Sequence, residues 1–191
     1  MGPLWWVRED GTCACDSPRC RPRDWGKHPI AKPGIVPHGL RDFSDHVGQV
    51  AGWWRRYPEA NIGLLPPAGT FGLDVDDPAT WQARGPILPR VGPVQLTGSG
   101  GGRRQHLYHL DGHAPGEVAF NKPLTGYGVE TKGDGDGYLV VAPSITSEPY
   151  RWVRTGPVPV LPDALWAILP RKAERTSSTN ISVHDCCAVP A

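Results

Sequence analysis

The chain has 191 residues and is nearly neutral, with 20 lysines and arginines against 19 acidic residues. Near neutrality excludes nucleic-acid binding through bulk charge, so any such contact must come from local patches. There is no apolar run of about 18 residues, as a membrane span requires, and the first ten residues do not follow the pattern of a secretory signal. We therefore expect a cytoplasmic protein without membrane contact, whose five cysteines act as thiols or metal ligands and not as disulfides.

The N-terminal third predicts a loop-rich, metal-stapled element followed by a helix. Residues 13–38 are polar, basic and rich in proline, with closely spaced cysteines. A helix is expected over residues 42–57, capped by Ser44 and ended by Pro58. Its expected apolar face consists of Val47, Val50, Trp53 and Trp54.

The rest of the chain predicts short strands with a few helices between them. Strands are expected at residues 61–65, 70–76, 94–97, 106–110, 128–132, 138–142 and around Trp152, and helices at residues 78–84 and 162–169. The strands at 128–132 and 138–142 flank a Gly/Asp turn and predict a hairpin. Because strands outnumber helices and their connections are short, the predicted fold class is α+β with antiparallel pairing. Residues 171–191 show no periodicity and predict a loose tail.

Two carboxylates provide the strongest local motif. Phe71, Leu73 and Val75 alternate with polar positions, so they predict a strand with one buried side. Asp74 and Asp76 are two residues apart and therefore project from the opposite side together. Such a pair can share Mg²⁺ or Mn²⁺ ions, which prefer oxygen ligands, and a two-metal site can catalyse phosphoryl transfer. The alternative is a strand that ends in an acidic turn.

Glu130 is a third candidate ligand, since a carboxylate in the middle of a strand is costly unless it is paired or binds metal; the alternative is an edge strand that faces water. A glycine-rich stretch, residues 97–102, precedes Arg103, Arg104 and His106. Its backbone amides could approach phosphates closely, although such stretches are often plain tight turns. It is neither a Walker A loop nor a dinucleotide fingerprint, because no Gly-Lys-Ser/Thr and no helix follow.

Three cysteines and a histidine form the fourth motif. Cys13, Cys15 and Cys20 precede His28, and sulfur and imidazole ligands of this kind favour a closed tetrahedral zinc site. The Cys-x-Cys spacing is tighter than usual, and His38 is a rival fourth ligand.

The order of these motifs resembles the N-terminal catalytic domain of bifunctional DNA primase/polymerases, in the archaeo-eukaryotic primase superfamily. The acidic pair after an apolar strand, the Ser-Gly-Gly…His strand and the acidic strand leading to Gly137–Ser144 occur in the family's order. Upstream, the cysteines, Gly26-Lys-His-Pro29, Trp53-Trp54 and the segment from Pro58 to Gly63 also match. The resemblance runs from about Cys13 to about Trp152.

The resemblance implies a fold and a set of site residues. The fold would be an RRM-like antiparallel sheet with flanking helices, and residues 1–170 would form the catalytic domain. Asp74, Asp76 and Glu130 would hold the catalytic Mg²⁺ or Mn²⁺, and His106 would contact the incoming nucleotide's phosphates. Further nucleotide contacts are expected at Ser99, Gly100, Gly101, Arg103, Arg104 and Lys132, and DNA contacts at Lys27, His28, Arg55 and Arg56.

The sequence also departs from the family pattern. Glu130 stands where the family usually has aspartate, and residues 103–105 lengthen the gap between the glycines and His106. The helicase region of longer relatives is missing from this chain, so a separate helicase is the expected partner, beside template, primer and nucleoside triphosphates.

The implied reaction is attack of a 3′-hydroxyl on the α-phosphate of a nucleoside triphosphate. Two alternatives remain: a nucleic-acid-binding module that has lost catalysis, and a metal-dependent phosphodiesterase with the same three acids.

Overall fold

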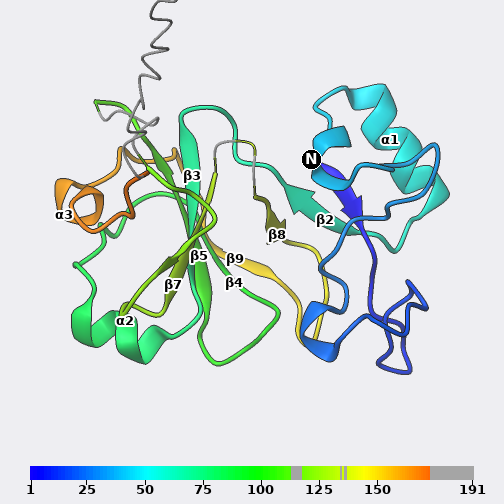
Figure 1. Ribbon diagram of the computed structural model, residues 1–191, viewed down its shortest axis with the longest axis horizontal. Coiled ribbons are helices and arrows are strands. Elements are labelled where there is room, and N and C mark those ends of the chain that lie inside the picture. Colours follow the sequence, from blue (N-terminus) through cyan, green and yellow to red (C-terminus); the bar gives the residue numbers. More distant parts are fainter. Residues whose placement is uncertain (113–117, 134, 136, 173–191) are drawn as a thin grey trace, which may run out of the picture.

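Antiparallel sheets dominate the computed structural model, which describes residues 1–112, 118–133, 135 and 137–172. The strands form two sheets, one of three strands and one of six, and few helices accompany them (Figure 1). This mixture of short helices and antiparallel sheets confirms the predicted α+β class in its coarse form.

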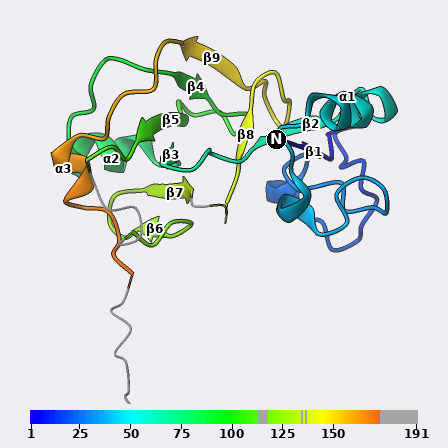
Figure 2. The ribbon, with the colours of Figure 1, turned by 90° about the horizontal axis from the view of Figure 1, so that it is seen from above.

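The six-stranded sheet has the order β6-β7-β3-β5-β4-β9, which can be followed from one edge to the other in Figure 2. Its strands are β6 (Pro123–Leu124), β7 (Val129–Gly133), β3 (Thr70–Val75), β5 (Arg104–His109), β4 (Val94–Leu96) and β9 (Arg151–Arg154). All of these neighbours pair antiparallel. The sheet accounts for five of the predicted strands, and the central strand β3 is paired on both sides.

The main hydrophobic core lies against one face of this sheet. Phe71, Leu73 and Val75 of β3 are almost completely buried there, as the alternation of the sequence predicts. Tyr108 of β5 and Leu165 of α3 (Asp163–Trp166) belong to the same cluster. Because side chains alternate along a strand, the opposite face of the sheet receives the polar residues of β3.

The three-stranded sheet consists of β1 (Gly2–Leu4), β2 (Asn61–Leu64) and β8 (Leu139–Val141). The predicted hairpin is wrong, because β7 pairs with β3 and β6 whereas β8 pairs with β2 in the other sheet. β8 also lies over the polar face of the large sheet, where Leu139 contacts Gly72 so closely that a Cβ on Gly72 would overlap it. A local turn signal could not reveal this long-range choice of partner.

The first predicted helix is shorter than expected. α1 (Val47–Arg56) begins with His46 as its N-cap, whose ring accepts from the Gln49 amide. Ser44 instead accepts from the amide of His46 at 3.0 Å and therefore does not cap the helix. Val47 is 80% exposed, so it does not belong to the buried face either.

Of the remaining helices, α2 (Pro78–Arg84) follows the prediction closely and α3 does not. α2 has the predicted bounds, with Asp77 as its N-cap accepting from the amide of Thr80 at 3.0 Å. α3 is shorter than the predicted 162–169. Among the residues that the structure describes, no helix is long and apolar enough to cross a membrane.

Residues 5–60, which we call the N-terminal segment, have a small hydrophobic core of their own. The segment contains the 3₁₀ turns η1 (Pro22–Asp24) and η2 (Gly39–Asp42) together with α1. The buried residues of this core are Trp5, Cys13, Ala14, Ile30, Ile35, Val36, Trp53 and Ala60. It lies beside the three-stranded sheet, away from α2 and α3 (Figure 1).

Candidate functional site

The structure brings the three predicted carboxylates to one cleft. Asp74 on β3 is paired in register with Glu130 on the neighbouring strand β7, so both side chains project from the polar face of the sheet. Asp76 follows β3 and lies on the same side. All three line a cleft of about 740 Å³, which lies between the polar face and the N-terminal segment.

Asp74 is the most deeply buried of the three acids. Burial first, and then the negative charge of Asp76, raise the pKa of Asp74 to about 7. Its Oδ1 is buried without a hydrogen-bond partner among the described residues, whereas Oδ2 accepts from Gln105 Nε2 at 3.0 Å. Burial also raises the pKa of Asp76. An unpaired, desolvated carboxylate oxygen of this kind suits a divalent cation, which would favour the ionised form.

Glu130 is held by a neighbouring lysine. Its Oε2 lies 2.8 Å from Nζ of Lys132, two residues along the same strand. Among the described residues the ligand atoms of these acids are not gathered as closely as those of the cysteine group below. The oxygen donors therefore fit Mg²⁺ or Mn²⁺ in kind, and Glu130 would have to exchange its lysine partner for the metal.

A chain of buried amides fixes the orientation of Asp74. Gln95 Oε1 accepts from the amide of Ala142 at 3.0 Å, and Gln95 Nε2 donates to the carbonyl of Val140 at 2.8 Å. The same Nε2 donates to Gln105 Oε1, so Gln105 must present its own Nε2 to Asp74. Backbone groups of β8 and of the residue that follows it thus determine, through two glutamines, that the acid receives a hydrogen-bond donor.

The glycine-rich stretch is a tight turn between β4 and β5 at one end of the cleft. Gly100, Gly101 and Gly102 have φ values of 68°, 63° and 73°, a left-handed run that only glycine adopts readily. Arg103 Nη1 donates to the carbonyl of Ser99 at 3.2 Å, and its Nε donates to the carbonyl of Asp76 at 2.7 Å. The turn and the acidic pair are thereby tied together.

Lysine side chains complete the positive charge of the cleft. Lys27, from the N-terminal segment, donates from Nζ to Ser99 Oγ at 3.0 Å, and Lys132 lines the same cleft. Near Asp76, the positive charges of Arg103, Lys27 and Lys132 oppose the rise of its pKa. The cleft therefore combines carboxylates with cations, as a site for a metal-bound triphosphate requires.

His106 is not brought to this cleft. It is paired in register with Leu73, so its side chain projects from the core face, opposite to Asp74. It is 7% exposed, and burial, aided by Arg104 and Arg154, lowers its pKa to about 4. His106 and Arg104 line a separate cavity of about 670 Å³. The acid-facing position of β5 belongs to Gln105, one residue earlier.

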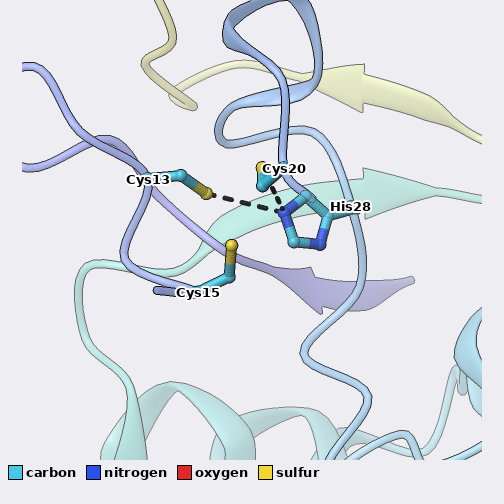
Figure 3. Close-up of side chains that lie close together, drawn as sticks. All are labelled: Cys13, Cys15, Cys20 and His28. Atoms are coloured by element: carbon cyan, nitrogen blue, oxygen red, sulfur yellow. Dashed lines mark hydrogen bonds between the residues drawn. The ribbon is translucent and has the colours of Figure 1, made fainter. Parts of the chain in front are cut away.

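The cysteine motif forms a compact group (Figure 3). The ligand atoms of Cys13, Cys15, Cys20 and His28 all lie within 4.8 Å of one another. Nε2 of His28 lies 3.5 Å from Sγ of Cys13 and 3.3 Å from Sγ of Cys20. A tetrahedral zinc ion, about 2.3 Å from sulfur and about 2.1 Å from nitrogen, would set such atoms roughly 3.6 Å apart. The group could hold zinc, and its fourth member is His28, as the motif predicted. The rival ligand His38 instead contacts Asp42. His28, which we also expected at the DNA, therefore belongs to the cysteine group.

Two further predicted site residues lie outside the acidic cleft, and the sequence did not predict several residues that line it. Arg55 and Arg56 are exposed near the end of α1 and do not line the cleft. The sequence reasoning overlooked Arg23, Asp24, Gln105, Asn121, Tyr138 and Tyr150, all of which line it. The period-two alternation of β5 could have identified Gln105. The other five come from the 3₁₀ turn η1, from loops and from residues next to strands, where sequence spacing does not predict which way a side chain points.

Comparison with known protein families identifies the class of protein. The model of the bifunctional DNA primase/polymerase N-terminal family matches residues 5–164, and the chain belongs to this family. At family level it is a domain of a primase/polymerase-type enzyme. No curated protein and no solved structure matches the chain.

Proposed function

We propose that the acidic cleft is the active site of a metal-dependent nucleotidyltransferase, which extends or starts nucleic-acid chains on a DNA template. The observation that carries this proposal is the arrangement of Asp74, Asp76 and Glu130 on adjoining strands, directed into one cleft with Lys27 and Lys132. Family membership supports the reaction type. The proposal includes a sheet of the primase type, with an RRM-like core, in residues 1–170.

The carboxylates would hold two Mg²⁺ or Mn²⁺ ions, and these would supply charge neutralisation for the attacking 3′-hydroxyl and the leaving pyrophosphate. No side-chain nucleophile is needed, because the reaction depends on positioning and on stabilising charge. Asp74 is oriented by Gln105 and ionises when cation binding offsets its burial. Glu130 would complete the oxygen ligands, and Lys132, which now pairs with it, would then be available to a phosphate.

The triphosphate would lie along the glycine turn. Lys27 and Arg103 approach this turn from two directions, through Ser99. The open backbone at Gly101 and Gly102 leaves room for phosphate oxygens, whereas the Glu148 carboxylate lies beside Gly100. We assign the phosphate contacts to Lys27, Arg103 and Lys132, and not to His106 or Arg104, because those two side chains line the cavity on the core face.

The remaining components of the proposal follow from the sequence. Arg55 and Arg56, exposed on α1, are proposed DNA contacts, and their contribution should depend strongly on salt. Zinc is proposed as the ion of the cysteine group. A separate helicase is the proposed partner for unwinding, and a cytoplasmic location is proposed for an enzyme that uses DNA and nucleoside triphosphates.

Extension of a labelled primer–template with dNTPs and either Mg²⁺ or Mn²⁺ tests the proposal. We expect metal-dependent extension by the wild type and a loss of at least a hundredfold in the Asp74→Ala/Asp76→Ala variant. The matched control is Asp77→Asn, which changes the adjacent acid while asparagine still caps α2, and it should extend normally.

Other outcomes would redirect the assignment. Template binding without extension under either metal would indicate a binding module that has lost catalysis. Primer shortening that needs no nucleotide would indicate a phosphodiesterase that uses the same acids.

A further inference from the structure

The segment between two members of the cysteine group forms one wall of the acidic cleft. Residues 21–27 lie between Cys20 and His28. Arg23, Asp24 and Lys27 of this segment line the cleft together with the carboxylates of the large sheet. We call residues 21–27 the cleft wall.

The His28 end of the cleft wall is attached to the rest of the protein. The carbonyl of Lys27 accepts from the Tyr138 hydroxyl at 2.6 Å, and the carbonyl of Gly26 accepts from Asn61 Nδ2 at 2.9 Å. The carbonyl of His28 accepts from the amide of Trp5 at 2.9 Å. This end needs no metal to keep its place.

The Cys20 end has a different set of contacts. Its backbone bonds are local, from Cys20 to the carbonyl of Ser17 and from Asp24 to that of Arg21. Trp25 Nε1 also bonds within the segment, to the carbonyl of Cys20 at 3.3 Å. The backbone of the cleft wall connects the two ends through the amide of Lys27, which donates to the carbonyl of Asp24 at 3.1 Å. Cys20 itself reaches the anchored end through the approach of its sulfur to His28. A metal ion bound by both would replace that weak contact with two coordinate bonds.

We infer that a zinc ion held by Cys13, Cys15, Cys20 and His28 fixes the Cys20 end of the cleft wall, and thereby keeps Arg23 at the cleft for the phosphates of a nucleoside triphosphate. The inference rests on the proposed function for the identity of the ligand. Asp74 and Glu130 are on β3 and β7, and Asp76 directly follows β3. Loss of zinc therefore leaves the acids in place and weakens nucleotide binding.

The test compares three variants with the wild type. Cys15→Ser removes a half-buried ligand while leaving the buried Cys13 in the core. Cys186→Ser is the matched control for loss of one thiol. Arg23→Gln removes the charge of Arg23 without changing the ligand set. Zinc content, hydrogen exchange of the cleft wall, and dATP affinity in the presence of Mn²⁺ are measured for each. Circular dichroism checks folding, and chelation of the wild type followed by zinc re-addition replaces Cys15→Ser if that variant unfolds.

We expect about one zinc ion per chain in the wild type and in Cys186→Ser, and none in Cys15→Ser. Loss of zinc should speed exchange in residues 21–25 and weaken dATP binding roughly two- to fivefold, the worth of one exposed ion pair. Arg23→Gln should weaken binding equally with zinc retained. The double variant should be no weaker than either single variant, because both act through the same side chain.

Unchanged dATP affinity and exchange after zinc loss would overturn the inference, as would a wild type that takes up no zinc. Fully additive effects in the double variant would also overturn it. A wild type that binds dATP in this zinc-dependent way but extends no primer would refute the polymerase proposal and leave this inference standing.

Discussion

The buried carboxyl of Asp74 should impose a measurable stability cost on the metal-free protein. Burial and the charge of Asp76 raise its pKa to about 7 in the folded state, whereas an unfolded aspartate titrates near 3.9. A raised carboxyl pKa means that the fold favours the protonated form. Stability is therefore lost as the pH rises from about 4 to about 7, by roughly 1.4 kcal/mol per pH unit and about 4 kcal/mol in total.

The Asp74→Asn substitution removes this titration while keeping the shape of the side chain. In EDTA, the unfolding free energy of Asp74→Asn minus that of the wild type should increase by roughly 3 kcal/mol between pH 5 and pH 8. Urea denaturation followed by the fluorescence of the eight tryptophans measures it. Mn²⁺ at pH 8 should stabilise the wild type more than the variant, since binding to the folded state adds stability.

The control for this measurement is Asp77→Asn. Hydrogen bonds from Thr80 lower the pKa of Asp77, so this carboxyl is fully ionised above pH 5. The unfolding free energy of Asp77→Asn minus that of the wild type should therefore stay constant from pH 5 to pH 8. A flat difference for Asp74→Asn as well would refute the conclusion that burial keeps this carboxyl protonated in the absence of metal.

Three further substitutions test the hydrogen bond to Asp74 and the packing of the glycine-rich turn. Gln105→Leu deprives Asp74 of its donor and should cost roughly 1–3 kcal/mol of stability, with weaker Mn²⁺ binding by calorimetry; unchanged affinity would contradict an orienting role for the amide chain. Gly98→Ala should cost about 1–3 kcal/mol in urea denaturation, because its Cβ would overlap Thr146. Gly101→Ala has open space but a φ of 63°, and should cost only about 1–2 kcal/mol; equal losses in both variants would argue against the clash.

The success of the sequence predictions depended on how local each feature is. The alternation of Phe71, Leu73 and Val75 and the bounds of α2 follow from short-range periodicity and capping, and the structure confirms both. The predicted N-cap of α1 was wrong because Ser44 and His46 can both accept hydrogen bonds from nearby amides. Which of the two caps the helix depends on where its first turn begins.

The facing of β5 shows how a small shift in position changes an inferred role. A strand has a period of two residues, so moving the expected contact by one position transfers it to the other face of the sheet. His106 was expected to face the acids, but it pairs with Leu73 and lies on the core face, and Gln105, which pairs with Asp74, faces the acids instead. Pairing with β3 sets the register, and that pairing is a tertiary contact, so the sequence of β5 alone could not assign the acid-facing side chain.

The sequence by itself determined the family, the acidic strand, the glycine turn and the cysteine spacing, because each of these is encoded within a few neighbouring residues. Only the tertiary structure decided that β8 leaves β7 for the other sheet and that Gln105 faces Asp74. It also decided that the cleft wall between Cys20 and His28 lies across from the acids. These contacts join residues far apart in the chain, and burial and strand pairing select them from many arrangements that local patterns permit equally.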